Sequence, residues 1–210
     1  MTYAASLLLI TGIYLAVLAS PGPNFFILSQ MALDGRHREA RYAVYGLTTG
    51  SIFWVLVSMA GLATLLSQHP WLASALRYIG AAYLMWYGAR LLWSAFSPSV
   101  AREVNAQAFD RGGKPLTAYR TGLLTGMTNP KGAAFWTSAF AAVFPAAAPF
   151  WFYALTVLLV AALSLGWHLG ITLIFGTPTL RGFYLRIERG VNGVAGGVLV
   201  TLGLQRLLSR

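Results

Sequence analysis

The sequence predicts an all-α, polytopic membrane protein with six transmembrane helices, arranged as two inverted three-helix repeats. Two observations carry the membrane assignment. Of its 210 residues, 57% are hydrophobic and only 10% are charged, and the mean hydropathy is +0.64, which is too apolar for a soluble domain of this length. The apolar residues also gather in runs of roughly 20, the length that a helix needs to cross a bilayer.

The apolar runs place the six spans at residues 3–32, 41–66, 71–96, 116–144, 150–175 and 189–208. The first and fourth runs are longer than a crossing requires, which is expected for helices that are interrupted inside the membrane. No basic segment precedes the first run, so we interpret it as a helix of the mature protein and not as a signal peptide.

The basic residues predict the orientation and the repeat. Most of them lie in three connectors, namely Arg36, Arg38 and Arg41, then Arg90, Arg102, Arg111, Lys114 and Arg120, then Arg181, Arg186 and Arg189. Positive residues favour the cytoplasmic side, so both termini are expected outside. The polar connector 97–115 separates a first repeat (1–96) from a second (116–210) within one transmembrane domain. Because each repeat has an odd number of spans, the second is inverted relative to the first.

The first helix of each repeat is predicted to be broken by a proline–asparagine cluster. The clusters are Pro21, Gly22, Pro23 and Asn24 in the first run, and Asn129, Pro130 and Lys131 in the fourth. Hydrocarbon offers no partner for freed backbone groups, so such a break is tolerated where those groups face protein, water or a ligand. Counted at ~1.5 Å per residue from the adjacent connectors, both breaks lie near the membrane midplane. We therefore expect them to face each other, as the broken helices of a transporter's binding site do; a purely structural kink is the alternative.

The two clusters carry groups suited to a zwitterionic amino acid. Proline lacks an N–H, so carbonyls upstream of Pro21 and Pro23 become acceptors for an ammonium, while the helix starting at Asn24 presents amides to an anion. Asn129 is expected to cap the half-helix that follows it. Lys131 is the only basic residue deep in a span, and we expect it to attract a substrate carboxylate. The alternative is that Lys131 bonds helix-end carbonyls or reaches a water-filled vestibule.

His168, in the fifth run, is the only membrane-embedded group that titrates near neutrality. It is a candidate for a proton-linked role, with a hydrogen-bonded structural histidine as the alternative. No Asp or Glu falls inside a predicted span, which argues against a carrier of multivalent cations. The chain has no cysteine, which excludes thiolate metal sites. We predict no cofactor and no metal site, and the net charge of +10 lies in connectors, where it indicates topology and not nucleic-acid binding.

Small and aromatic residues suggest how the helices pack. Glycine pairs spaced by four occur at Gly46/Gly50, Gly122/Gly126, Gly166/Gly170 and Gly193/Gly197. Such pairs permit close helix packing within the chain or in a homodimer. An aromatic group, consisting of Phe25, Phe26, Phe53, Trp54 and Trp136, is expected either to line a pocket or to face lipid.

The chain resembles the LysE/RhtB family of amino-acid exporters nearly end to end. The resemblance rests on Ala19 to Phe26, on Gly46 and Gly50, and on the asparagine-proline-lysine at 129–131. Ser29, Gln30 and the segment 193–210 make it most similar to the threonine and homoserine efflux branch. Many members have aspartate where this chain has Asn24, which cannot ionise.

The resemblance implies a secondary transporter, not an enzyme, in the bacterial inner membrane. It implies export of threonine-like or related neutral amino acids from the cytoplasm, driven by the proton gradient, in contact with lipid. Two alternatives stay open: an exporter of another small metabolite or amino-acid derivative, and a membrane assembly subunit without transport. The nucleophile and metal motifs of intramembrane proteases do not occur in the sequence.

Overall fold

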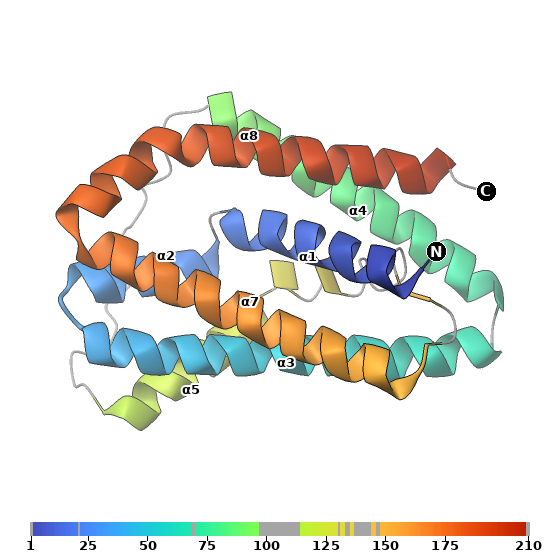
Figure 1. Ribbon diagram of the computed structural model, residues 1–210, viewed down its shortest axis with the longest axis horizontal. Helices are drawn as coiled ribbons and strands as arrows, with labels where there is room; N and C mark the ends of the chain where they lie inside the picture. Colours follow the sequence, from blue (N-terminus) through green and yellow to red (C-terminus); the bar gives the residue numbers. More distant parts are fainter. Residues whose placement is uncertain are drawn as a thin grey trace.

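A computed structural model describes residues 2–20, 22–68, 70–96, 114–129, 131–132, 135–136, 144–145 and 148–208. This part of the chain is helical and has no strand. Its helices are α1 (Tyr3–Ala19), α2 (Pro23–Leu33), α3 (His37–Gln68), α4 (Pro70–Phe96), α5 (Pro115–Thr128), α7 (Phe150–Gly176) and α8 (Pro178–Leu208). They form an elongated bundle in which α4 pairs with α8, α3 packs against α5 and α7, and α1 lies between the two groups (Figure 1).

Most predicted spans correspond to helices. The first run forms α1 and α2, which are bent by 55° at the predicted break, and three further runs form α3, α4 and α7. The fourth run begins with α5, which ends where the second break was predicted. Within the described residues, α3 and α7 are long and apolar enough to cross a membrane, and the bent α1–α2 pair makes a third if it is one span. The linker residues 97–113 lie outside the described part.

The sixth run departs from the prediction, because α8 begins at Pro178 and not near residue 189. The region that we interpreted as a connector is therefore helical, and a single residue, Thr177, separates α7 from α8. Proline is well suited to the first position of a helix, since the missing N–H would have no partner there. Charged residues before position 190 limit the apolar run in the sequence, but α8 is helical through them. Glu188, which was expected in a connector, is only 3% exposed on α8.

Two glycine-rich crossings bring helix backbones into direct contact. A methyl group added to Gly46 would lie 2.1 Å from the Tyr119 carbonyl oxygen, and one added to Gly122 would lie 2.1 Å from that of Ala43. Any side chain larger than hydrogen would therefore force α3 and α5 apart. The predicted close packing is confirmed for the Gly46/Gly50 and Gly122/Gly126 pairs, which meet each other.

The other predicted glycine pairs do not make such contacts. Gly166, Gly170 and Gly197 have no atom within 4 Å of an added methyl group. The second crossing instead joins α4 to α8 through Gly88 and Gly196, where an added methyl group on either would lie 2.7 Å from the carbonyl oxygen of the other. A homodimer stays a prediction.

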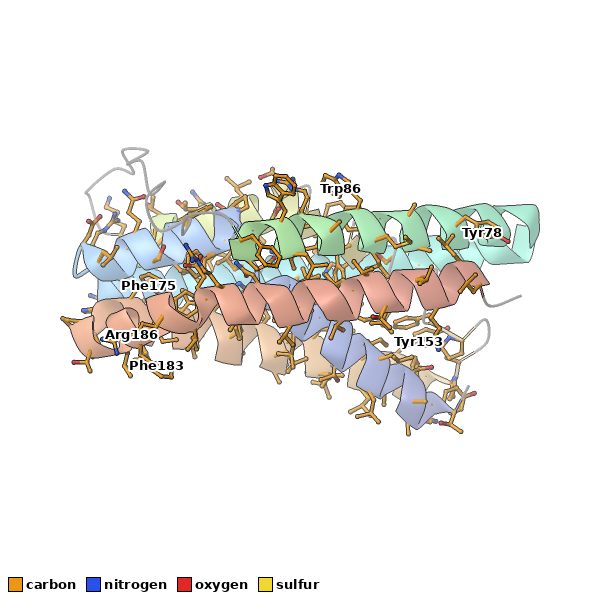
Figure 2. The ribbon with its side chains drawn as sticks, turned by 90° about the horizontal axis from the view of Figure 1, so that it is seen from above. Tyr78, Trp86, Tyr153, Phe175, Phe183 and Arg186 are labelled. Atoms are coloured by element: carbon orange, nitrogen blue, oxygen red, sulfur yellow. The ribbon has the colours of Figure 1, made fainter. Side chains whose placement is uncertain are left out.

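The outside of the bundle is apolar. Large hydrophobic side chains point outward along it, among them Leu8 (73% exposed), Trp93 (78%), Phe150 (85%) and Phe96 (88%). Trp86, on the outer side of α4, is 54% exposed, and the Arg90 guanidinium lies 5.2 Å from its ring centroid (Figure 2). A surface of this kind suits contact with lipid.

Candidate functional site

The two helix breaks meet inside the bundle. The Asn129 side-chain amide donates to Asn24 Oδ1 at 3.0 Å, and Lys131 Nζ donates to the Ser20 carbonyl oxygen at 2.8 Å. The two bonds join positions more than a hundred residues apart in the sequence, which confirms that the breaks face each other. Pro21 and Pro130 lie outside the described residues.

The first break has an extended backbone. Ser20 (φ −78°, ψ 136°) ends α1, and Gly22 (φ −171°, ψ −176°) precedes α2, which begins at Pro23. Gly22 gives α2 no side-chain cap. Partial positive charge gathers at a helix N-terminus, so this turn is a favourable place for an anion. A methyl group added to Gly22 would lie 3.5 Å from Lys131 Cδ and Nζ, which places the lysine directly against this turn.

The second break is built from side-chain contacts. Asn129 (φ −68°, ψ 107°) ends α5, and its Oδ1 accepts from the Lys131 backbone N–H at 3.0 Å. This is the bond expected of a cap by Asn129, although most of the segment that it was expected to cap lies outside the described residues. On α5, the carbonyl of Met127, one of the last in the helix, accepts from Trp54 Nε1 at 3.2 Å. This bond satisfies one of the carbonyls that a helix end leaves without an internal partner.

Lys131 is held by α1 and by two tyrosines of α4. Its ammonium also contacts the Ser20 hydroxyl, which pairs with the Tyr87 hydroxyl, and it lies 5.3 Å from the Tyr87 ring centroid. Tyr83, stacked on Tyr87 with ring centroids 5.9 Å apart, donates to the Lys131 carbonyl at 3.4 Å. From the sequence, Lys131 was expected either to attract a substrate carboxylate or to bond helix-end carbonyls or reach a vestibule. In this structure it bonds a helix-end carbonyl, that of Ser20. Sequence reasoning missed both tyrosines, although their spacing of four places them on one helix face.

A cavity of about 50 Å³ opens between the breaks. It is lined by Tyr14, Val17, Leu18, Ser20, Gly22, Asn24, Phe25, Ser51, Trp54, Gly126, Asn129, Lys131, Gly132, Phe135, Trp136, Trp167, His168 and Ile171. Among these described lining residues, Lys131 is the only Lys or Arg and there is no acid. The described residues also contain no group of three His, Asp or Glu side chains that could hold a metal.

The predicted aromatic group is only partly at the cavity. Phe25, Trp54 and Trp136 line it, whereas Phe53 is 39% exposed and Phe26 is not in the lining. Sequence reasoning missed other members of the wall, in particular Tyr14, Ser51, Phe135 and Trp167. No break or charge marks these four residues in the sequence.

His168 lines the cavity and has a hydrogen-bonded neighbour. It is 2% exposed, and its Nδ1 lies 3.1 Å from the Ser164 hydroxyl, one turn earlier on α7. The Ser164 hydroxyl in turn lies 3.2 Å from Thr48 Oγ1 and 3.5 Å from the Ser51 hydroxyl, both on α3. His168 is therefore part of a polar contact between α3 and α7, and the proton-linked role stays a prediction.

Comparison with known proteins identifies the family. The sequence model of the LysE type translocator matches residues 15–210. The threonine efflux protein of Salmonella typhi is 29% identical over 204 residues, which cover 94% of this chain and 95% of that protein. The threonine efflux protein of Escherichia coli K12 is 27% identical over 202 residues, covering 94% and 95%. The leucine efflux protein of Enterobacter sp. strain 638 is 31% identical over 132 residues, covering 62% and 59%. No solved structure gives a significant match. Because the family match covers nearly the whole sequence, the chain belongs to the LysE family of translocators.

Proposed function

We propose that this chain is a secondary transporter that exports neutral amino acids of the threonine and homoserine type from the bacterial cytoplasm across the inner membrane. The observation that carries the proposal is a single lysine, Lys131, in a cavity whose described lining has no acid. An amino-acid carboxylate complements this ammonium, whereas a basic side chain would find no opposite charge there. The threonine and leucine efflux proteins among its relatives support amino acids as the cargo.

The contact between Lys131 Nζ and the Ser20 carbonyl suggests how the substrate binds. In this desolvated site the two groups pair with each other, and the Ser20 hydroxyl and the Tyr87 ring are the other neighbours of the ammonium. A zwitterion placed between them satisfies both, because its carboxylate accepts from Lys131 and its ammonium donates to the Ser20 carbonyl. Gly22, Asn24 and Asn129 line the cavity beside them, and the proposed substrate-binding set also includes Pro21, Pro23 and Pro130 from the two sequence clusters.

Substrate entry requires the breaks to separate. By the measure in which one water needs ~10–15 Å³, the cavity of about 50 Å³ holds only a few waters and is too small for an amino acid. The bond between Asn24 and Asn129 joins the two breaks, and both residues line this cavity. We assign the breaks to two inverted three-span repeats (1–96 and 116–210), with the cytoplasmic linker 97–115 between them. Movement of one repeat against the other would then expose the site to each side in turn.

We further propose that the proton gradient drives export and that His168 is the proton-linked group. A histidine changes charge near physiological pH, and this one lies in the wall of the cavity. In proteoliposomes, the His168→Gln variant is then expected to lose proton-driven accumulation of threonine while it still equilibrates threonine down its own gradient. Unchanged accumulation would reject this role for His168.

The function is tested by efflux from cells loaded with a mixture of labelled amino acids, with and without the protein and with and without a proton uncoupler. Selective loss of threonine or homoserine that the uncoupler abolishes is the expected result. Unchanged efflux of every amino acid, with the protein present in the membrane, would contradict it and favour another small metabolite or a non-transport subunit.

A further inference from the structure

A second group of polar side chains reaches the same cavity from α1, α3 and α7, away from the residues of the two breaks. We call it the hydroxyl cluster, and it consists of Tyr14 on α1, Thr48 and Ser51 on α3, and Ser164 and His168 on α7. Tyr14, Ser51 and His168 line the cavity directly. Neither break contributes to the cluster, so the cavity has two distinct sets of polar groups.

Four of the five members of the cluster are almost completely shielded from solvent, and Ser51 is half-buried. Tyr14, Thr48, Ser164 and His168 are 3%, 5%, 0% and 2% exposed. Buried hydroxyls need partners, and most of these have them within the cluster, with Ser164 between Thr48 and His168. Such bonds can hold helices together in a membrane, so packing alone would account for the α3–α7 part.

Tyr14 is the member that helix packing does not explain. Its hydroxyl lies beside the Ser51 and Ser164 hydroxyls but meets hydrogen-bond geometry with no atom of the described residues. Its ring is fixed between Phe135 and Trp136, with centroids 6.0 Å and 4.9 Å away. A buried hydroxyl that lies beside two others without good hydrogen-bond geometry is stabilised by a better-placed partner. The wall of the cavity is where such a partner would sit.

We propose that the hydroxyl cluster is the subsite for the substrate's side chain and that it selects a hydroxyl group, with Tyr14 and Ser51 as specificity-determining residues. The proposal rests on the export function proposed above. With the α-carboxylate and α-ammonium held at the breaks, the side chain occupies the remaining wall. A hydroxyl both donates and accepts, so it can satisfy Tyr14 and Ser51 together. A methyl group of the same size leaves the Tyr14 hydroxyl without this partner, whereas the Ser51 hydroxyl keeps its bond to the Leu47 carbonyl oxygen at 3.1 Å. A site built around a hydroxyl rejects such an analogue strongly.

Threonine and valine provide the test, because they differ by a hydroxyl in place of a methyl group of similar size. Export of each from loaded proteoliposomes is measured at equal internal concentration. The unmodified protein is expected to export threonine at least ~100-fold faster than valine. Tyr14→Phe, which removes only the hydroxyl, is expected to lower that ratio at least ~10-fold, and Ser51→Ala is expected to lower it in the same direction.

Tyr184→Phe is the matched control. The Tyr184 hydroxyl is also buried without a partner among the described residues, but Tyr184 packs against Phe25 and Phe175 and does not line the cavity. The ratio of threonine export to valine export in Tyr184→Phe is expected to equal that of the unmodified protein. The amount of each variant in the vesicles is measured, so that a folding loss is not read as a change in selectivity.

The outcomes separate this inference from the proposed function. If the unmodified protein exports valine as fast as threonine, or if Tyr14→Phe and Ser51→Ala slow both equally, the cluster is a packing contact only and the inference is wrong while export stands. If no amino acid is exported, the function and the subsite both fail.

Discussion

The two helix breaks contribute different kinds of polar group to one site. The first break supplies mainly backbone groups, the Ser20 carbonyl and the uncapped start of α2 after Gly22, beside the neutral side chains of Ser20 and Asn24. The second supplies side chains, the amide of Asn129 and the ammonium of Lys131. A substitution deletes a side chain but not a backbone group. The two halves of the site should therefore respond unequally to mutation, although they face each other.

The helices that lead to the breaks are also held differently. On α5, Gly122 is in backbone contact with α3, whereas on α1 a methyl group added to Gly12 would have no atom within 4 Å. The break that carries the charge is thus the one whose helix is fixed by direct backbone contact. Misplacing a charged group in an apolar interior raises the free energy more than misplacing a neutral one. A firmly held helix is therefore expected at the break that carries Lys131.

Replacing the glycine at the α3–α5 crossing should give the largest effect. Gly122→Ala places a methyl group 2.1 Å from the Ala43 carbonyl oxygen, so α5 must move or the fold must fail. Overpacking of this kind costs about 3 kcal/mol, which corresponds to a fall of roughly 6–12 °C in Tm for a chain of this size. The matched change Gly12→Ala should leave Tm unchanged or slightly raised. Thermal unfolding in detergent compares them, and equal Tm values would refute the proposed difference between α5 and α1.

Removing the charge at the second break should abolish most transport without removing the fold. Lys131→Met deletes the proposed partner of the substrate carboxylate, and a charge-assisted hydrogen bond is worth up to ~3 kcal/mol, or about 100-fold in efflux rate. Lys131→Arg keeps the charge and should recover part of the rate. Arg90→Met, which deletes a charge beside the exposed Trp86, is the control and should export normally. Normal export by Lys131→Met at normal membrane levels would remove Lys131 from the site.

Substitution of Asn24 and of Asn129 should lower the efflux rate by different, smaller amounts at the two breaks. Asn129 makes two of the described hydrogen bonds, to Asn24 and to the Lys131 N–H, whereas Asn24 makes only the one that they share. At about 1 kcal/mol for each neutral bond, Asn129→Ala is expected to slow efflux roughly 10–30-fold and Asn24→Ala roughly 5-fold.

A double-mutant cycle on these two asparagines then measures their shared bond. The double variant should be only slightly slower than Asn129→Ala alone, because the common interaction is lost once. Fully additive effects would mean that the bond between the breaks plays no part in transport.

The smallest effect is expected at the tyrosine that supports Lys131. Tyr87→Phe removes the hydroxyl that pairs with Ser20 but keeps the ring beside the ammonium. Efflux should fall about 2–5-fold, the size expected for one neutral hydrogen bond away from the substrate. A loss as large as that of Lys131→Met would mean that Tyr87 contacts the substrate itself.

The sequence was sufficient to predict the helical fold class, most helix positions and the meeting of the two breaks, because proline and charge leave strong local signals. It did not locate the start of α8, since arginines at the end of an apolar run were interpreted as a connector. Pro178 was the available signal, as proline is common at the first position of a helix.

The wall of the cavity was harder to predict for a physical reason. α1 has no distinct polar face, so nothing in its sequence indicates which way Tyr14 points. The Ser164–His168 pair follows a helical spacing, but its partners on α3 become visible only once the helices are packed. Likewise, neither Gly88 nor Gly196 has another glycine four residues away, so no glycine motif in the sequence marks the crossing of α4 and α8.

In the proposed mechanism, the site between the breaks recognises the carboxylate of a neutral amino acid through Lys131. The most direct test is competition of threonine and threoninamide, which lacks the carboxylate, against efflux of labelled threonine from loaded vesicles. Threonine is expected to compete at least ~100-fold better than its amide, and Lys131→Met is expected to lose this preference. Equal competition by the amide in the unmodified protein, or an intact preference in Lys131→Met, would contradict it.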